Sequence, residues 1–102
     1  MTRIRYFLEE GQSVVFDATN YREDLRDQPV HTGRWCGAEI NSYFFDVGLN
    51  TALERNRKRP RSVPEHVIRR HYRLLSPPCL YEADWQHVVD EDGKCWRYWP
   101  EE

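Results

Sequence analysis

The sequence is short of the residues that build a nucleotide cradle. It has five glycines in 102 residues, and none of them stands in a GxxxxGK[ST] pattern; its lysines are Lys58 and Lys94 alone. That pattern supplies the backbone amides and the lysine that hold the phosphates of a bound nucleotide. We therefore do not expect this chain to transfer a phosphoryl group from ATP by itself.

Patterns for metal binding and membrane insertion are also missing. Cys36, Cys79 and Cys95 form no CxxC pair, so we expect reduced thiols that pack like small hydrophobic side chains. The four histidines are scattered, and we expect no metal held by protein ligands alone. No apolar run approaches the roughly 18 residues of a membrane span, and the N-terminal stretch lacks a signal-peptide core. We expect a cytoplasmic protein with no membrane partner.

What remains is a small and highly charged domain. Charged residues make up 31% of the chain and hydrophobic residues 39%, with aromatic side chains supplying much of the apolar bulk. This length predicts one domain over residues 1–102, with a modest core. We divide it into a strand–helix core (1–52), a basic segment with its following helix (53–78), and a final strand with a Trp-rich hairpin (79–102).

Positive charge is concentrated in one place. Eight of the fifteen Lys and Arg residues lie between Arg55 and Arg73, where Glu65 is the one acid, so this segment carries about +7 on a chain of net charge −2. Arginine makes bidentate contacts to phosphate. Arg55 and Arg59 are four residues apart, which on a helix places them on one face where they can converge on one anion. A solvated charged helix remains the alternative interpretation.

Two helices are predicted around this segment. The first covers 48–58, with Leu49, Ala52 and Leu53 on its inner face. The second opens at Pro64, with Ser62 as a possible N-cap, and stops before Pro77 and Pro78. Its apolar side would comprise Val63, Val67, Ile68, Leu74 and Leu75. The basic, proline-containing elbow at 59–61 is what a phosphate-covering lid needs.

Two apolar runs predict buried strands. Val14, Val15 and Phe16 form a short continuous run typical of a strand buried on both faces, followed by Asp17, Ala18, Thr19 and Asn20. These polar residues either cap the next helix or face a ligand at the carboxyl end of the strand. The second strand is predicted over 40–47.

The remaining elements are shorter. We predict a helix over 2–10 with Gly11 at its end, a helix over 21–27, a loop over 28–33, and packing of Trp35 and Cys36. A turn or short helix at 81–84 leads to a strand at 85–89, a turn at 90–93 and an edge strand at 94–99. Trp96 and Trp99 are expected to pack; stacking on bases is the weaker alternative.

Three of these pieces together resemble a known family. VVFDATN (14–20), GAEINSYFFDVGLNTALERN (37–56) and ERNRKR followed by VPEHVIRRHYRLLSPP (54–59 and 63–78) are similar, in order and spacing, to P-loop kinases related to polynucleotide 5′-hydroxyl kinases, a group that includes AAA-type and zeta-toxin-like small kinases. The resemblance covers about residues 1–89. It departs from the family in lacking the phosphate loop and the acceptor-activating aspartate, so the chain enters the family pattern near the helix before the third strand.

The resemblance implies a fold and a set of functional residues. It implies a small three-layer α/β sandwich with a short, mostly parallel sheet, derived from the P-loop kinase fold without its phosphate-loop strand. Arg55, Arg57 and Arg59 would be a phosphate clamp, with Arg55 and Arg59 as candidate catalytic lid arginines. Asp17, Thr19, Asn20 and Arg22 would lie on the acceptor or metal side.

The sequence leaves three functional hypotheses open. The first is a P-loop-less remnant or half of a nucleotide-kinase-like phosphotransferase, using Mg-ATP only if a partner polypeptide supplies the phosphate-loop strand. The second is a non-enzymatic module that binds nucleic acid or phosphate through Arg55–Arg73. The third is a small protein-interaction subunit that uses an open sheet edge and the Trp-rich tail. The expected partner is a polypeptide that supplies the phosphate-loop strand, or further copies of this chain in a homo-oligomer.

Overall fold

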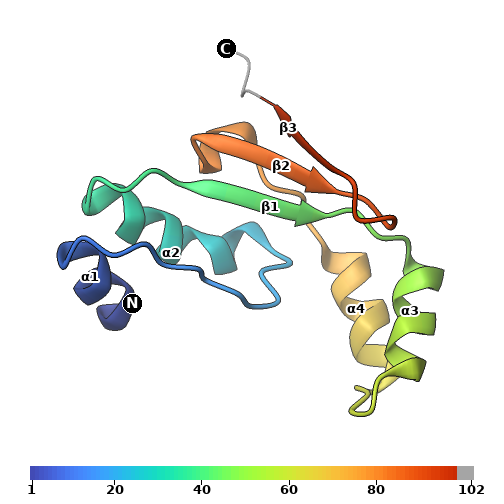
Figure 1. Cartoon of the computed structure of the whole chain (residues 1–102). Coiled ribbons are helices and arrows are strands. Elements are labelled where there is room, and N and C mark those ends of the chain that lie inside the picture. The colour runs from blue at the N-terminus through green and yellow to red at the C-terminus, as the bar shows by residue number, and fades with distance from the viewer. Residues whose placement is uncertain (99–102) are drawn as a thin grey trace.

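A three-stranded sheet in the order β1-β2-β3 forms the centre of the computed structural model, which describes residues 1–98 (Figure 1). β1 (Asn41–Phe45) pairs in parallel with β2 (Trp85–Val89), and β2 pairs antiparallel with β3 (Cys95–Tyr98). The sheet is therefore mixed, not mostly parallel, and β1 and β3 are its edges. All three strands fall within ranges predicted from the sequence. Trp96 on β3 is 54% exposed, so the prediction that it packs is wrong, and Trp99 lies outside the described residues.

The strand predicted at 14–16 is wrong. Residues 13–16 have no regular secondary structure and pair with no strand of residues 1–98, and the Val15 side chain is 91% exposed. A buried strand needs neighbouring strands for its backbone hydrogen bonds and apolar residues packed on both of its faces. The apolar run in the sequence shows that the strand could be buried, but not which strands would lie next to it. Pairing fails here because no other strand of residues 1–98 lies beside this segment.

α2 is one continuous helix where the sequence predicted a short helix and a loop. It runs over Glu23–Trp35 and contains Pro29 in its interior. Gly33 explains part of this result, because it is buried and a Cβ there would lie 3.3 Å from Ile40 Cδ1. Close packing of α2 at Gly33 thus outweighs the cost of proline and glycine within the helix. Trp35 at its end is 73% exposed, so the prediction that it packs is wrong.

The other helices lie close to their predicted positions. α1 covers Thr2–Glu9, and Gly11 follows it with φ +80. α3 covers Leu49–Lys58 and α4 covers Glu65–Leu74, joined by the predicted basic elbow. The N-cap of α4 is Pro64, not Ser62, and no side chain caps it. A 3-10 turn, η1 (Leu80–Glu82), leads into β2.

The arrangement of the layers differs from the predicted sandwich. α1 and α2 lie beside one another on one side of β1, and the α3–α4 pair projects beyond the carboxyl ends of β1 and β2 (Figure 1). Tyr43 and Phe45, on one face of β1, are 56% and 65% exposed, so no helix layer covers that face at β1 within residues 1–98. A third layer is therefore absent there.

The core is very small. Leu53 and Ala83 are the buried hydrophobic residues among those described, as predicted for Leu53. Of the predicted apolar side of α4, no residue within the helix is fully buried. Cys36 and Cys79 are half-buried, whereas Cys95 is exposed and is not packed as expected. None of the helices in residues 1–98 has the length and apolar character needed to cross a membrane.

Candidate functional site

The α3–α4 hairpin is fixed to the carboxyl end of the sheet. α3 begins right after β1, where the Gly48 N–H donates to Glu91 Oε1 at 2.8 Å. About two turns later, Arg55 Nη2 donates to the backbone oxygen of Glu91, also at 2.8 Å. Because Glu91 lies in the turn between β2 and β3, both bonds hold α3 against the end of the sheet. In α/β sheets this end is where ligands bind.

A single buried amide closes the connection between the two helices. Asn56 is 4% exposed; its Nδ2 donates to Val63 O at 2.8 Å, and its Oδ1 accepts from Val63 N at 3.0 Å. This bidentate pair joins the last turns of α3 to the residue before Pro64. The loop 59–62 between them is therefore held as a closed turn.

Three of the eight basic residues in the segment are already engaged. Arg55 binds Glu91 O, Arg57 Nε lies 2.7 Å from Glu65 Oε1, and Lys58 Nζ lies 3.0 Å from Glu54 Oε1. The hydrogen bond and positive charge of Arg57 hold the pKa of Glu65 below its usual range, and Lys58 does the same for Glu54. These exposed pairs stabilise the hairpin weakly.

The remaining arginines carry charge without a carboxylate partner. None of them makes an ion pair within residues 1–98; they are Arg59, Arg61, Arg69, Arg70 and Arg73. Arg59 and Arg61 lie on the closed turn, exposed to solvent. Arg59 is the C-cap of α3 with ψ 140, so it has left the helix that was expected to place it on one face with Arg55. Arg55 and Arg59 are thus not held as a preformed pair.

The polar residues expected to face a ligand lie in an extended loop. Asp17 and Thr19 are exposed, and Asn20 is half-buried with φ 43, a left-handed conformation that asparagine tolerates. The backbone oxygen of Asn20 accepts a hydrogen bond from Arg26 Nη1 at 2.9 Å. Arg22 forms a bidentate pair with Asp24, at 2.9 and 2.8 Å. The sequence left two interpretations of 17–20, a helix cap or a ligand-facing group. Capping is not observed, because the N-cap residue of α2 is Arg22 and its side chain makes no capping hydrogen bond.

This loop meets the hairpin through Tyr21. The Tyr21 ring stacks on His71 of α4, with ring centroids 4.3 Å apart, and Tyr21 O accepts from the N–H of Ser76 at 2.8 Å. Ser76 Oγ in turn accepts from the N–H of Glu23 at 2.9 Å. Within residues 1–98 no hydrogen bond or ion pair joins Asp17, Thr19 or Asn20 to Arg55, Arg57 or Arg59. The structure thus brings the two segments to the same end of the fold without joining their functional groups.

Sequence reasoning missed a buried ion pair between α2 and η1. Arg26 and Glu82, 8% and 6% exposed, form a bidentate pair at 2.8 and 3.1 Å. Burial alone would raise the pKa of Glu82, but the bonds from Arg26 and from the Cys79 N–H prevail and hold it below its ordinary value. The two residues lie 56 positions apart, so no sequence spacing points to the pair.

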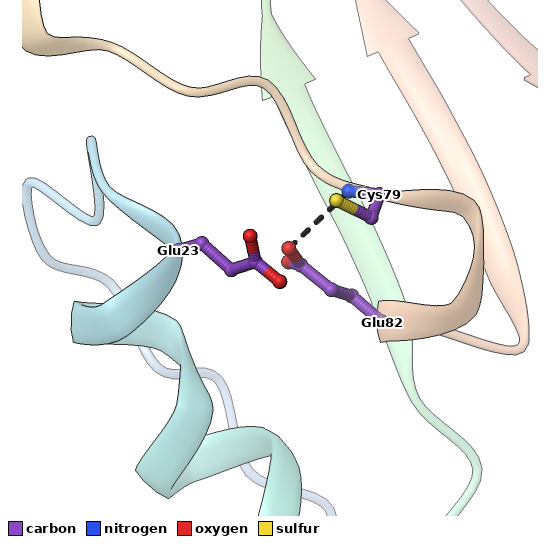
Figure 2. A group of neighbouring side chains, drawn as sticks. All are labelled: Glu23, Cys79 and Glu82. Atoms are coloured by element: carbon purple, nitrogen blue, oxygen red, sulfur yellow. Dashed lines mark hydrogen bonds between the residues drawn. The ribbon is translucent and has the colours of Figure 1, made fainter.

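The same cluster contains three groups of metal-ligand type. The ligand atoms of Glu23, Cys79 and Glu82 lie within 4.8 Å of one another (Figure 2). Arg26 already neutralises Glu82, and the Tyr81 hydroxyl donates to Glu23 Oε1 at 2.6 Å, a bond that raises the pKa of Tyr81. A cation here would have to displace a guanidinium from a buried carboxylate. The cluster is therefore a structural network that joins α2 to η1.

Comparison with known proteins places the sequence among kinase-like domains. A family model described as an AAA domain matches residues 1–78. An L-seryl-tRNA(Sec) kinase of Methanococcus maripaludis is 29% identical over 75 residues, which is 74% of this chain and 29% of that protein. The chain thus spans less than a third of the length of this curated relative. No solved structure matches.

Proposed function

Because this chain belongs to the AAA domain family, we propose that its α3–α4 hairpin binds phosphate groups as the lid part of a kinase-like phosphotransferase. The observation that carries the proposal is the closed turn at the tip of the α3–α4 hairpin, where Arg59 and Arg61 are exposed and form no ion pair within residues 1–98. The hairpin projects beyond the carboxyl ends of β1 and β2, the end of an α/β sheet at which ligands bind (Figure 1). Guanidinium groups held next to one another bind phosphate oxygens by charge-assisted hydrogen bonds.

The other candidate residues contribute at the edge of this site. Arg57 is bonded to Glu65 and Arg55 to Glu91 O, so each would have to exchange its present partner for phosphate. The Arg57 pair is exposed to solvent, so it costs little to open. On the opposite side of the Tyr21–His71 contact, Asp17, Thr19, Asn20 and Arg22 would face the acceptor.

The residues of this chain do not fit Mg-ATP by themselves. No glycine-rich loop with its lysine is present in the sequence, and the buried carboxylate of Glu82 is neutralised by Arg26. The donors that would hold the β- and γ-phosphates and magnesium would then come from outside these 102 residues, and we propose a partner polypeptide as their source. Alone, the chain would bind phosphate and would not transfer it.

RNA is the acceptor class that deserves a first test. The curated relative is named as a kinase of a tRNA-bound seryl group, and clustered arginines bind nucleic-acid backbones as readily as free nucleotides. The proposal therefore includes an RNA phosphate as ligand of the same arginines. A non-enzymatic nucleic-acid module is the second candidate, favoured by the same unpaired arginines.

Titration distinguishes these alternatives. The purified chain is titrated with magnesium-ATP and with a short 5′-hydroxyl RNA at two salt concentrations. Binding of the RNA that weakens steeply with salt supports a phosphate-binding hairpin, and tight ATP binding would show that a nucleotide cradle exists in this chain after all.

Paired variants locate the site. Replacing both turn arginines, Arg59→Gln with Arg61→Gln, is expected to weaken binding about tenfold or more, since each charge-assisted hydrogen bond contributes roughly 1.5–3 kcal/mol. The matched control, Arg3→Gln with Arg5→Gln on α1, removes the same charge far from the hairpin and should leave affinity within a factor of about two or three. Equal losses in both double variants would contradict the proposal.

A further inference from the structure

β1 is an edge strand, and its outer backbone groups have no hydrogen-bond partner within residues 1–98. Ile40 O accepts from the N–H groups of Asp84 and Trp85, and Asp46 N donates to Val89 O, so even-numbered residues of this stretch face β2. In a strand, the N–H and C=O of one residue point to the same side and those of the next residue to the other. The groups of Asn41, Tyr43 and Phe45 therefore face the open edge.

The same three residues expose their side chains on one face. Asn41 is exposed, and Tyr43 and Phe45 are 56% and 65% exposed. The Tyr43 ring is held in place by stacking on His87, with centroids 4.2 Å apart and planes 9° apart, and His87 Nε2 lies 3.0 Å from Asn41 Oδ1. An ordered aromatic side chain loses little conformational freedom when it enters an interface.

The two edges of the sheet are protected differently. Natural edge strands are usually blunted by lysine, arginine, proline or a short length. β3 has four residues, one of them Arg97, and Lys94 comes just before it. β1 has five residues, Asn-Ser-Tyr-Phe-Phe, with no charge and no proline. The unprotected edge is thus the one that also exposes two aromatic rings.

We propose that β1 pairs antiparallel with β1 of a second copy of this chain, about a twofold axis at Tyr43, joining two sheets into one of six strands. In this register Tyr43 lies opposite Tyr43 of the other copy, and Asn41 lies opposite Phe45. Each such pair of outward-facing residues exchanges two hydrogen bonds, so all the outward N–H and C=O groups of the three residues are used.

A second copy fits this edge better than an unrelated strand for two reasons. First, a contact between identical surfaces needs a self-complementary patch. In the proposed register the two copies place both Tyr43 rings and both Phe45 rings on one face of the joined sheet, and cross-strand aromatic pairs stabilise a sheet. The chain also has a net charge of only −2, so repulsion between copies is weak. This inference does not use the arginines of the hairpin, and its tests do not measure phosphate binding.

Sedimentation of the purified chain over a range of concentrations tests the association. The wild-type chain is expected to be dimeric at tens of micromolar. Tyr43→Pro removes an outward N–H that β2 does not use, so it should yield a folded monomer. Phe45→Lys gives the edge a charge and should also give a monomer, which keeps the test valid if the proline variant does not fold.

A matched control and an amide measurement make the test specific. Trp96→Lys changes a ring of similar exposure, 54%, on the other edge strand and should leave the dimer intact. In hydrogen exchange, the Tyr43 and Phe45 amides should gain protection with concentration, whereas the Phe44 amide, which faces β2, should be protected throughout. A wild-type chain that stays monomeric overturns the proposal, and this includes the case in which the β1 edge pairs with a strand of another polypeptide. A dimer that Phe45→Lys leaves intact also overturns it.

Discussion

Two segments with family-like sequences behave differently in the folded chain. The α3–α4 hairpin forms as predicted, and its connection is closed by Asn56 and Val63, which are seven residues apart. The 13–20 segment does not form its predicted strand, and Val15 is almost fully exposed. The hairpin needs only partners nearby in sequence, whereas a buried strand needs neighbours from elsewhere in the fold. The hairpin therefore forms from contacts between residues close in sequence, whereas the strand at 14–16 does not form because its partners would have to come from distant residues.

The largest expected effect concerns the contact that ties the N-terminal loop to the rest of the fold. Arg26→Ala leaves the buried Glu82 carboxylate without a counter-charge and removes the bond to Asn20 O, so it should destabilise the chain by about 3–5 kcal/mol. Urea unfolding followed by circular dichroism measures this. Arg34→Ala is the control, because its pair with Asp84 is exposed and should cost about 1 kcal/mol or less. Similar losses in both variants would contradict a special role for Arg26.

The next effect concerns the contact between Asn56 and Val63, which closes the α3–α4 hairpin. Asn56→Ala removes two hydrogen bonds and leaves Val63 N–H and C=O without them, and we expect a loss of about 2 kcal/mol. Thermal unfolding gives the stability, and titration with RNA should show weaker binding because the turn of Arg59 and Arg61 is released. Asn50→Ala, at an exposed position of the same helix, should change neither. Unchanged RNA affinity in a destabilised Asn56→Ala chain would show that phosphate binding does not depend on the Asn56–Val63 contact.

Acid should weaken the contact between Arg26 and Glu82. The folded-state pKa of Glu82 lies below its ordinary value of 4.5, so its stabilising contribution is complete above pH 4.5 and is lost as the pH falls through the lowered pKa. Urea midpoints measured from pH 7 to pH 3 should fall, and the fall should be shallower in Glu82→Gln. A Glu82→Gln chain with the same pH dependence as wild type would remove Glu82 as the source.

The smallest effect tests the strand that did not form. Val15→Asp places a charge on a side chain that is already 91% exposed, so the free energy of unfolding should change by less than about 0.5 kcal/mol. The same substitution at the buried Leu53 should unfold the chain, because an unpaired charge would enter the core. Unfolding of the Val15→Asp chain would mean that residues 13–16 are covered in solution.

Prediction from sequence succeeded where short-range patterns decide the structure. The apolar spacing of α3, Pro64 at the start of α4, the β-favouring run of β1 and the turn at 90–93 all point to the elements that form. α2 was misjudged because Pro29 and Gly33 are local signals for a break, while the burial of Gly33 under Ile40 is a tertiary contact. At the candidate site, the arginines were identified from the sequence, but their present partners were not.

The sequence by itself determined the basic segment, its two helices and membership of a kinase-like family, because charge, periodicity and motif order are properties of neighbouring residues. The tertiary structure decided which arginines form no ion pair, that Arg26 and Glu82 meet, that β1 is an edge strand within residues 1–98, and that residues 13–16 form no strand. These outcomes depend on residues tens of positions apart competing for the same backbone groups and charges. The spacing of residues along the sequence does not show which of these distant residues become partners in the fold.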